Sequence, residues 1–141
     1  MNAKYSKVIN TASLGYAGAV DEKGYPTIKA MSWNKKFYEA PGTFYFASNH
    51  GSMRAKLWKK NPKATLYFSK GFKGVMMWGK MEVLDTPELR AKLWTPISSF
   101  IYKNGGRDDP DYCILKFTAE RGRYYEGLST HNFELTPSDN I

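Results

Sequence analysis

The sequence predicts a mainly β domain, folded as a small antiparallel barrel that is closed or partly closed. Short segments rich in aromatic and β-branched residues recur at close spacing along the chain. Turns rich in Gly, Asp and Lys separate these segments, and the helical patterns between them are short. Closely spaced strands with short inserted helices are typical of small barrels.

The composition fits one folded domain that spans residues 1–141. Hydrophobic residues make up 42% of the chain and aromatic residues 16%, so a packed core is expected rather than disorder. No apolar run approaches transmembrane length, and residues 1–13 contain no apolar signal core. The single cysteine, Cys113, permits no intrachain disulfide. These observations favour a cytoplasmic protein without a membrane segment.

The first elements expected are a helix and a hairpin. Residues 2–11 fit a short helix. Residues 14–20 and 25–33 are two apolar segments joined by the turn sequence DEKG, which predicts a hairpin.

Residues 43–62 predict a strand, a tight loop and a helix in immediate succession. Residues 43–47 are aromatic and apolar, and residues 48–52 are small and polar. Residues 53–60 fit a helix with Ser52 as its N-cap and Pro62 beyond its end. The first turn of a helix favours acidic residues, yet this one carries Arg54. The pattern indicates either a phosphate-binding site or a solvated basic helix face.

The remaining elements complete the barrel. Strands are expected at residues 64–69 and 75–84, and Gly79 within the second suggests a bulge or bend. A helix should begin with Pro87 in its first turn, and a second short helix should run from residue 95 to about residue 104. Two further strands are expected at residues 112–118 and 121–127.

Familiar catalytic and metal-binding motifs do not occur in the sequence. It contains no phosphate-binding P-loop, no G-x-G-x-x-G and no G-x-S-x-G. Two histidines and one cysteine do not make a usual zinc set, so no metal site is expected. The net charge of +8 and the interleaving of Lys with aromatic residues keep a nucleic-acid-binding barrel open as an alternative.

Four segments carry a resemblance to a known family. They are PTIKAM at 26–31, FYFASNHGSMRAKLWKKNPKATLYF at 44–68, GVMMWGKMEVL at 74–84 and DPDYCILKFTAERGRYYEG at 109–127. In order and spacing they resemble the pyridoxamine 5'-phosphate oxidase-like group of FMN-binding split barrels, and the branch labelled general stress protein 26-like in particular. The resemblance implies a homodimer of six-stranded antiparallel split barrels, with two FMN molecules at the subunit interface.

The resemblance also implies a set of FMN-binding residues. A basic residue three positions after a proline falls on Lys29, and the phosphate motif falls on Ser52, Met53 and Arg54, so one of its two basic positions is Met53. A glutamine that lies near the flavin ring in the oxidases falls on Gly74. The expected cofactor-binding residues are Lys29, Ala30, Met31, Ser32, Ala47, Ser48, Ser52, Arg54 and Lys56.

The function implied by the resemblance is that of an FMN-dependent oxidoreductase acting on an unknown small substrate, with a role in stress. Residues 95–106 (TPISSFIYKNGG) offer no match to the Arg, Ser and Tyr that hold pyridoxal phosphate in the true oxidases. Pyridoxamine phosphate oxidase activity is therefore not expected, and no catalytic residue is assigned. A non-enzymatic flavin or cofactor binder of the same fold is the alternative.

Several large apolar residues also suggest a second contact surface. Trp33, Tyr45, Trp78 and Met81 lie on expected strands, where alternation cannot turn all of them toward one interior. Some are therefore expected to face a subunit interface.

Overall fold

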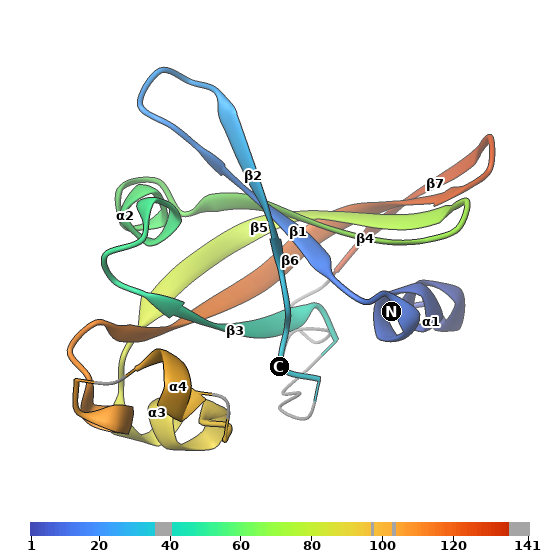
Figure 1. The fold of residues 1–141 in the computed structure, drawn as a ribbon. Coiled ribbons are helices and arrows are strands. Elements are labelled where there is room, and N and C mark those ends of the chain that lie inside the picture. Colours follow the sequence, from blue (N-terminus) through green and yellow to red (C-terminus); the bar gives the residue numbers. More distant parts are fainter. Residues whose placement is uncertain (36–40, 97, 103, 136–141) are drawn as a thin grey trace.

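The computed structural model describes residues 1–35, 41–96, 98–102 and 104–135 (Figure 1). Seven antiparallel strands of these residues form one sheet, in the order β2–β1–β4–β5–β6–β3, with β7 also paired to β6. The strands are β1 (Gly15–Val20), β2 (Pro26–Met31), β3 (Thr43–Asn49), β4 (Lys63–Lys70), β5 (Lys73–Leu84), β6 (Tyr112–Glu126) and β7 (Ser129–Glu134). The sheet curls strongly without closing in the part of the chain described. The predicted mainly β split barrel is therefore confirmed, with seven strands in place of six.

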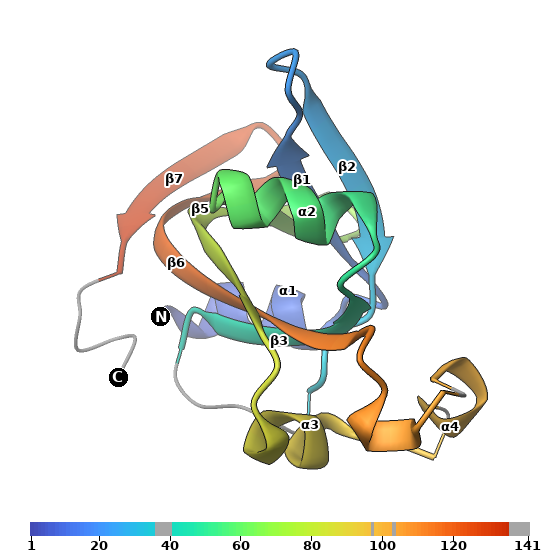
Figure 2. The ribbon, with the colours of Figure 1, turned by 90° about the vertical axis from the view of Figure 1, so that its left-hand side faces the viewer.

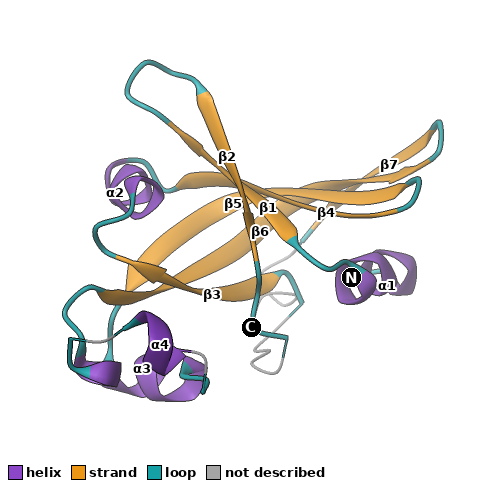
Figure 3. Cartoon of the chain, in the orientation of Figure 1, coloured by secondary structure: helices purple, strands orange, loops and turns teal. Residues whose placement is uncertain are grey.

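Short helices lie around this sheet (Figure 3). They are α1 (Ala3–Thr11), α2 (Met53–Lys60), α3 (Pro87–Leu93), α4 (Ser98–Ile101) and the 3-10 helix η1 (Gly106–Asp108). α2 crosses one end of the curled sheet, and α1 lies at the other end (Figures 1 and 2). None of the helices in the described ranges is long and apolar enough to span a bilayer.

The longest strand, β6, corrects the prediction for residues 112–127. Two strands were expected there, but residues 112–126 form one continuous strand. β5 pairs along one edge of β6, whereas β3 and β7 divide the other edge between them. β7 was missed because it is an exposed edge strand in which only Phe133 is partly buried.

The predicted irregularity at Gly79 is confirmed. The register of β5 against β6 shifts between Trp78 and Gly79, so that Trp78 pairs with Arg121 and Gly79 with Ala119. Glu120 is thus the extra residue of a bulge, which bends the strands. A side chain at Gly79 would collide with the carbonyl oxygen of Thr118.

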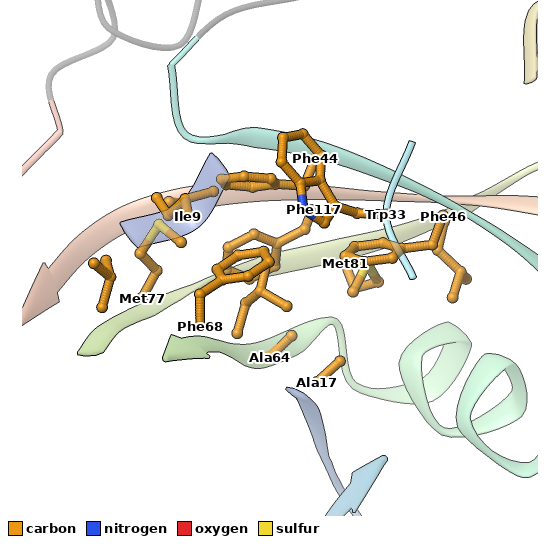
Figure 4. Close-up of a cluster of buried hydrophobic side chains, with 14 of the residues drawn as sticks. Ile9, Ala17, Trp33, Phe44, Phe46, Ala64, Phe68, Met77, Met81 and Phe117 are labelled. Atoms are coloured by element: carbon orange, nitrogen blue, oxygen red, sulfur yellow. The ribbon is translucent and has the colours of Figure 1, made fainter. Parts of the chain in front are cut away.

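Two buried clusters hold the elements in place. The main core fills the inside of the sheet with side chains that include Phe44, Phe68, Met77 and Phe117 (Figure 4). A second cluster beneath α3 and α4 contains Tyr45, Leu93, Tyr102, Tyr112 and Ile114.

As expected, Trp33, Tyr45, Trp78 and Met81 do not all face one interior. Trp33 and Met81 are buried in the main core and Tyr45 in the second cluster. The second cluster, which the sequence pattern does not reveal, provides the additional interior. Only Trp78 remains partly exposed, with the guanidinium of Arg121 4.1 Å from its ring centroid.

Candidate functional site

A hollow of about 380 Å³ lies where β2, β3 and the start of α2 meet. We call it the clamp hollow. Its described lining residues are Lys29, Ala30, Met31, Ser32, Ala47, Ser48, Asn49, Ser52, Arg54, Ile101 and Tyr102. Every cofactor-binding residue expected from the sequence is in this set except Lys56. The β1–β2 hairpin and the residue after it contribute residues 29–32 of this lining. The segment from β3 to the start of α2 contributes Ala47, Ser48, Ser52 and Arg54.

Lys56, the ninth expected residue, lies outside the lining of the clamp hollow. Successive helical residues are about 100° apart, so Lys56 points away from the side of α2 that carries Arg54. It lines a different hollow with Met53, Lys60 and the β1–β2 turn. Met53, which stands in place of a basic residue in the family motif, faces the same way and is 55% exposed.

The start of α2 has the features of an anion site. Ser52 is the N-cap, as predicted, and its hydroxyl accepts a hydrogen bond from the Ala55 N–H at 3.2 Å. Arg54 follows in a first turn that contains no acidic residue. Lys29 adds a second cation, and the described lining contains no carboxylate. A helix N-terminus with two cations and hydroxyl groups favours a bound phosphate or other anion.

Three lining residues were not expected from the sequence, namely Asn49, Ile101 and Tyr102. Ile101 ends α4, and Tyr102 follows it. The Tyr102 hydroxyl donates a hydrogen bond to the Ser48 carbonyl at 2.9 Å, and burial raises the pKa of this phenol to about 12. This contact joins residues far apart in the chain. No local sequence pattern could have indicated it.

His50 lies in the β3–α2 loop between two charged side chains. The Lys59 ammonium lies 2.8 Å from His50 Nδ1, and Asp85 Oδ2 lies 3.2 Å from His50 Nε2. Because an ammonium only donates, Nδ1 accepts and Nε2–H donates to Asp85. The imidazole thus ties the loop to α2 and to the end of β5.

A larger hollow of about 850 Å³ adjoins the clamp hollow. We call it the side hollow. The two share Ser32, Ala47, Ile101 and Tyr102. Trp33 and Leu93 give the side hollow an apolar wall. The clamp hollow therefore adjoins room suited to a flat apolar group.

Gly74 lies far from the clamp hollow within one chain. It pairs with Ser69 next to the β4–β5 turn, which lies at the opposite end of the sheet from α2 (Figure 1). The position that the resemblance sets near a flavin ring therefore does not reach the clamp hollow of its own chain.

Comparison with protein-family models decides the family. The model for pyridoxamine 5'-phosphate oxidase matches residues 1–126. The chain belongs to this family. The family resemblance expected from the sequence is confirmed.

Solved structures show the same fold. A Clostridium acetobutylicum protein related to general stress protein 26 of B. subtilis is 33% identical, with a TM-score of 0.80, and the match covers 96% of this chain and 97% of that one. General stress protein 26 from Bacillus anthracis is 18% identical, with a TM-score of 0.73 and coverage of 94% and 96%. A pyridoxamine 5'-phosphate oxidase-related FMN-binding protein from Nostoc punctiforme is 12% identical, with a TM-score of 0.72 and coverage of 96% and 87%. A search of curated proteins gave no significant match.

Proposed function

We propose that this chain binds FMN in the clamp hollow and acts as an FMN-dependent oxidoreductase on a small substrate. The observation that carries the proposal is the convergence of eight expected residues, from β2, β3 and α2, on one hollow without a carboxylate in its described lining. The FMN-binding neighbour from Nostoc punctiforme, which shares the fold, supports the same cofactor.

Each part of the site has a role that follows from its chemistry. Lys29 and Arg54 neutralise the phosphate, and the hydroxyls of Ser48 and Ser52 donate hydrogen bonds to it. When bound, FMN supplies hydride or single-electron transfer at its ring. Met31 and Ala47 give the ring an apolar wall, and the side hollow leaves room for a substrate next to it.

A non-enzymatic flavin binder is the second candidate. The described lining of the clamp hollow and the side hollow contains neither a carboxylate nor a histidine. These are the usual acids and bases of catalysis. All redox chemistry would then belong to the flavin.

A role in stress responses rests on the names of the neighbours related to general stress protein 26.

We further propose a homodimer in which two chains complete each site. The strand register places Ile28, Gly18, Thr65, Trp78 and Arg121 in one row across the outer face of the sheet. Ile28 on this face is 69% exposed, and the adjacent row contains Ala30, a lining residue of the clamp hollow. A second copy seated on this face would reach the site and could bring Gly74 to it. A cytoplasmic location fits the single cysteine, Cys113, which is buried and forms no disulfide.

Titration with FMN tests cofactor binding. We expect the flavin absorption bands to shift and the flavin fluorescence to change, saturating at one FMN per chain. Purified protein that takes up no flavin would contradict the proposal. Oxidation of NAD(P)H or reduction of a dye by the loaded protein would then favour the enzyme over the simple binder.

A further inference from the structure

The loop that enters α2 is held by a residue outside the clamp hollow. This residue is Asp111. Its backbone carbonyl accepts a hydrogen bond from the His50 N–H at 2.8 Å, and its carboxylate Oδ1 accepts one from the Gly51 N–H at 2.8 Å. Asp111 thus binds two consecutive N–H groups of the segment between Ser48 and Ser52. Both of these serines line the clamp hollow.

Asp111 is itself fixed from the protein interior. Its N–H donates to Asp109 Oδ1 at 2.9 Å, and Asp109 Oδ2 accepts from the Asn104 N–H at 3.2 Å. Asp109 is only 5% exposed. The next residue, Tyr112, begins β6 and pairs with Asn49 at the end of β3. A continuous set of short contacts therefore runs from buried groups to the loop.

The carboxylate of Asp111 lies next to the loop that contributes Ser48 and Ser52 to the clamp hollow. A negative charge near a phosphate site weakens phosphate binding. Gly51 allows the close approach, because a Cβ at this position would lie 3.3 Å from Asp111 Oδ1. The gain is a loop held in one conformation before the ligand arrives, which lowers the entropic cost of binding.

We propose that Asp111 is a positioning residue for the phosphate end of the site. It holds the Gly51 N–H and thereby sets the place of Ser52 and Arg54, although it does not line the clamp hollow. This inference rests on the proposed function. It adds that discrimination of FMN from riboflavin, which lacks the phosphate, depends on a carboxylate outside the site.

Two substitutions separate the hydrogen bond from the charge. Asp111→Ala removes both, and we expect FMN affinity to fall about tenfold, with riboflavin affinity changed less than about twofold. Asp111→Asn keeps an acceptor oxygen for the Gly51 N–H and removes the charge. This variant should bind FMN at least as tightly as the wild type does. Asp108→Asn, at an exposed residue at the end of η1, controls for the loss of one negative charge.

The experiment titrates FMN and riboflavin into folded wild type and each variant, with folding checked by circular dichroism. A wild type that does not prefer FMN would overturn the proposed function, and this inference with it. A wild type that prefers FMN, together with an Asp111→Ala variant that keeps this preference, would overturn this inference alone. Equal loss for both ligands would show a merely structural role. Tighter FMN binding in both Asp111→Ala and Asp111→Asn would show that Asp111 acts only by repelling the phosphate, and the inference would be wrong.

Discussion

Arg54 lies in the first turn of α2 and lines the clamp hollow. Charge-assisted hydrogen bonds to phosphate are among the stronger polar contacts. We therefore expect Arg54→Ala to weaken FMN binding roughly 10- to 100-fold. Riboflavin, which lacks the phosphate, should bind weakly to the wild type and respond little to the substitution. Isothermal titration with both ligands measures the difference.

Lys56→Ala is the matched control for Arg54. It removes the same charge from the same helix, but Lys56 lines another hollow. Because exposed charges at a distance are screened by salt, its effect on FMN should be less than about twofold at physiological ionic strength. If both variants lose FMN equally, net charge rather than contact governs binding.

A second prediction at the residue scale concerns alkaline pH. Burial raises the pKa of the Cys113 thiol from its ordinary value of 9.0 to about 11, and that of the Tyr102 phenol from 10.0 to about 12. The unfolded chain therefore releases these protons first, so stability is full below pH 9 and falls as the pH rises toward 11. Urea unfolding midpoints from pH 8 to 10.5 measure this. When the pH rises from 9 to 10, the unfolding midpoint of Cys113→Ala should fall less than that of the wild type. Equal falls for the two proteins would contradict the raised pKa of Cys113.

Single residues show what the sequence could and could not predict. Ser52 and Arg54 were predicted because capping and charge patterns are local. Lys56 was also predicted, but it lines a different hollow because helical rotation turns it away from the side of α2 that carries Arg54. Tyr102 and Asp111 were missed because their contacts, to Ser48 in β3 and to Gly51 in the β3–α2 loop, span more than fifty residues.

At the scale of elements, the inside–outside alternation predicted the central strands well. It failed near residue 120, where Glu120 and Arg121 are both exposed and suggest an end to the strand. The bulge explains this, because the extra residue interrupts the alternation while pairing with β5 continues on both sides. Gly79 indicated the irregularity, yet the sequence did not show that the insertion lies on the opposite strand.

Gly79 provides the test at this scale. An added methyl group would meet backbone atoms of Thr118 and Ala119, which cannot move without disturbing the ladder. Gly79→Ala should lower the free energy of unfolding by about 3 kcal/mol. Gly18→Ala is the control, since its nearest atoms are 3.8 Å away, and it should change stability by less than about 1 kcal/mol. Equal effects in urea denaturation would contradict this account of the bulge.

At the scale of the whole molecule, the net charge of +8 raises the question of nucleic acid. If the charge acts only through general attraction, binding to oligonucleotides should be weak, independent of sequence and steeply reduced by salt. Fluorescence anisotropy with labelled single strands across a salt series measures this. A tight complex that persists at physiological salt would favour the nucleic-acid-binding alternative over the flavoprotein.

The proposed homodimer would form through the outer face of the sheet. Tyr16 and Ile28 are 41% and 69% exposed, and Ile28 and Trp78 line a hollow of about 500 Å³ on this face. Such apolar surface usually marks an interface. We expect an isologous homodimer that buries on the order of 2,000 Å² or more.

FMN should stabilise this dimer, because a ligand that binds only the assembled state shifts the equilibrium toward it. Sedimentation across a dilution series, with and without FMN, measures the shift. Ile28→Arg places a charge in the proposed interface and should dissociate the dimer and weaken FMN binding together. Lys23→Arg, in the β1–β2 turn, conserves the charge and should change neither property. A wild-type monomer at micromolar concentration that binds FMN at full stoichiometry would show that one chain completes the site, and the shared-site proposal would then be wrong.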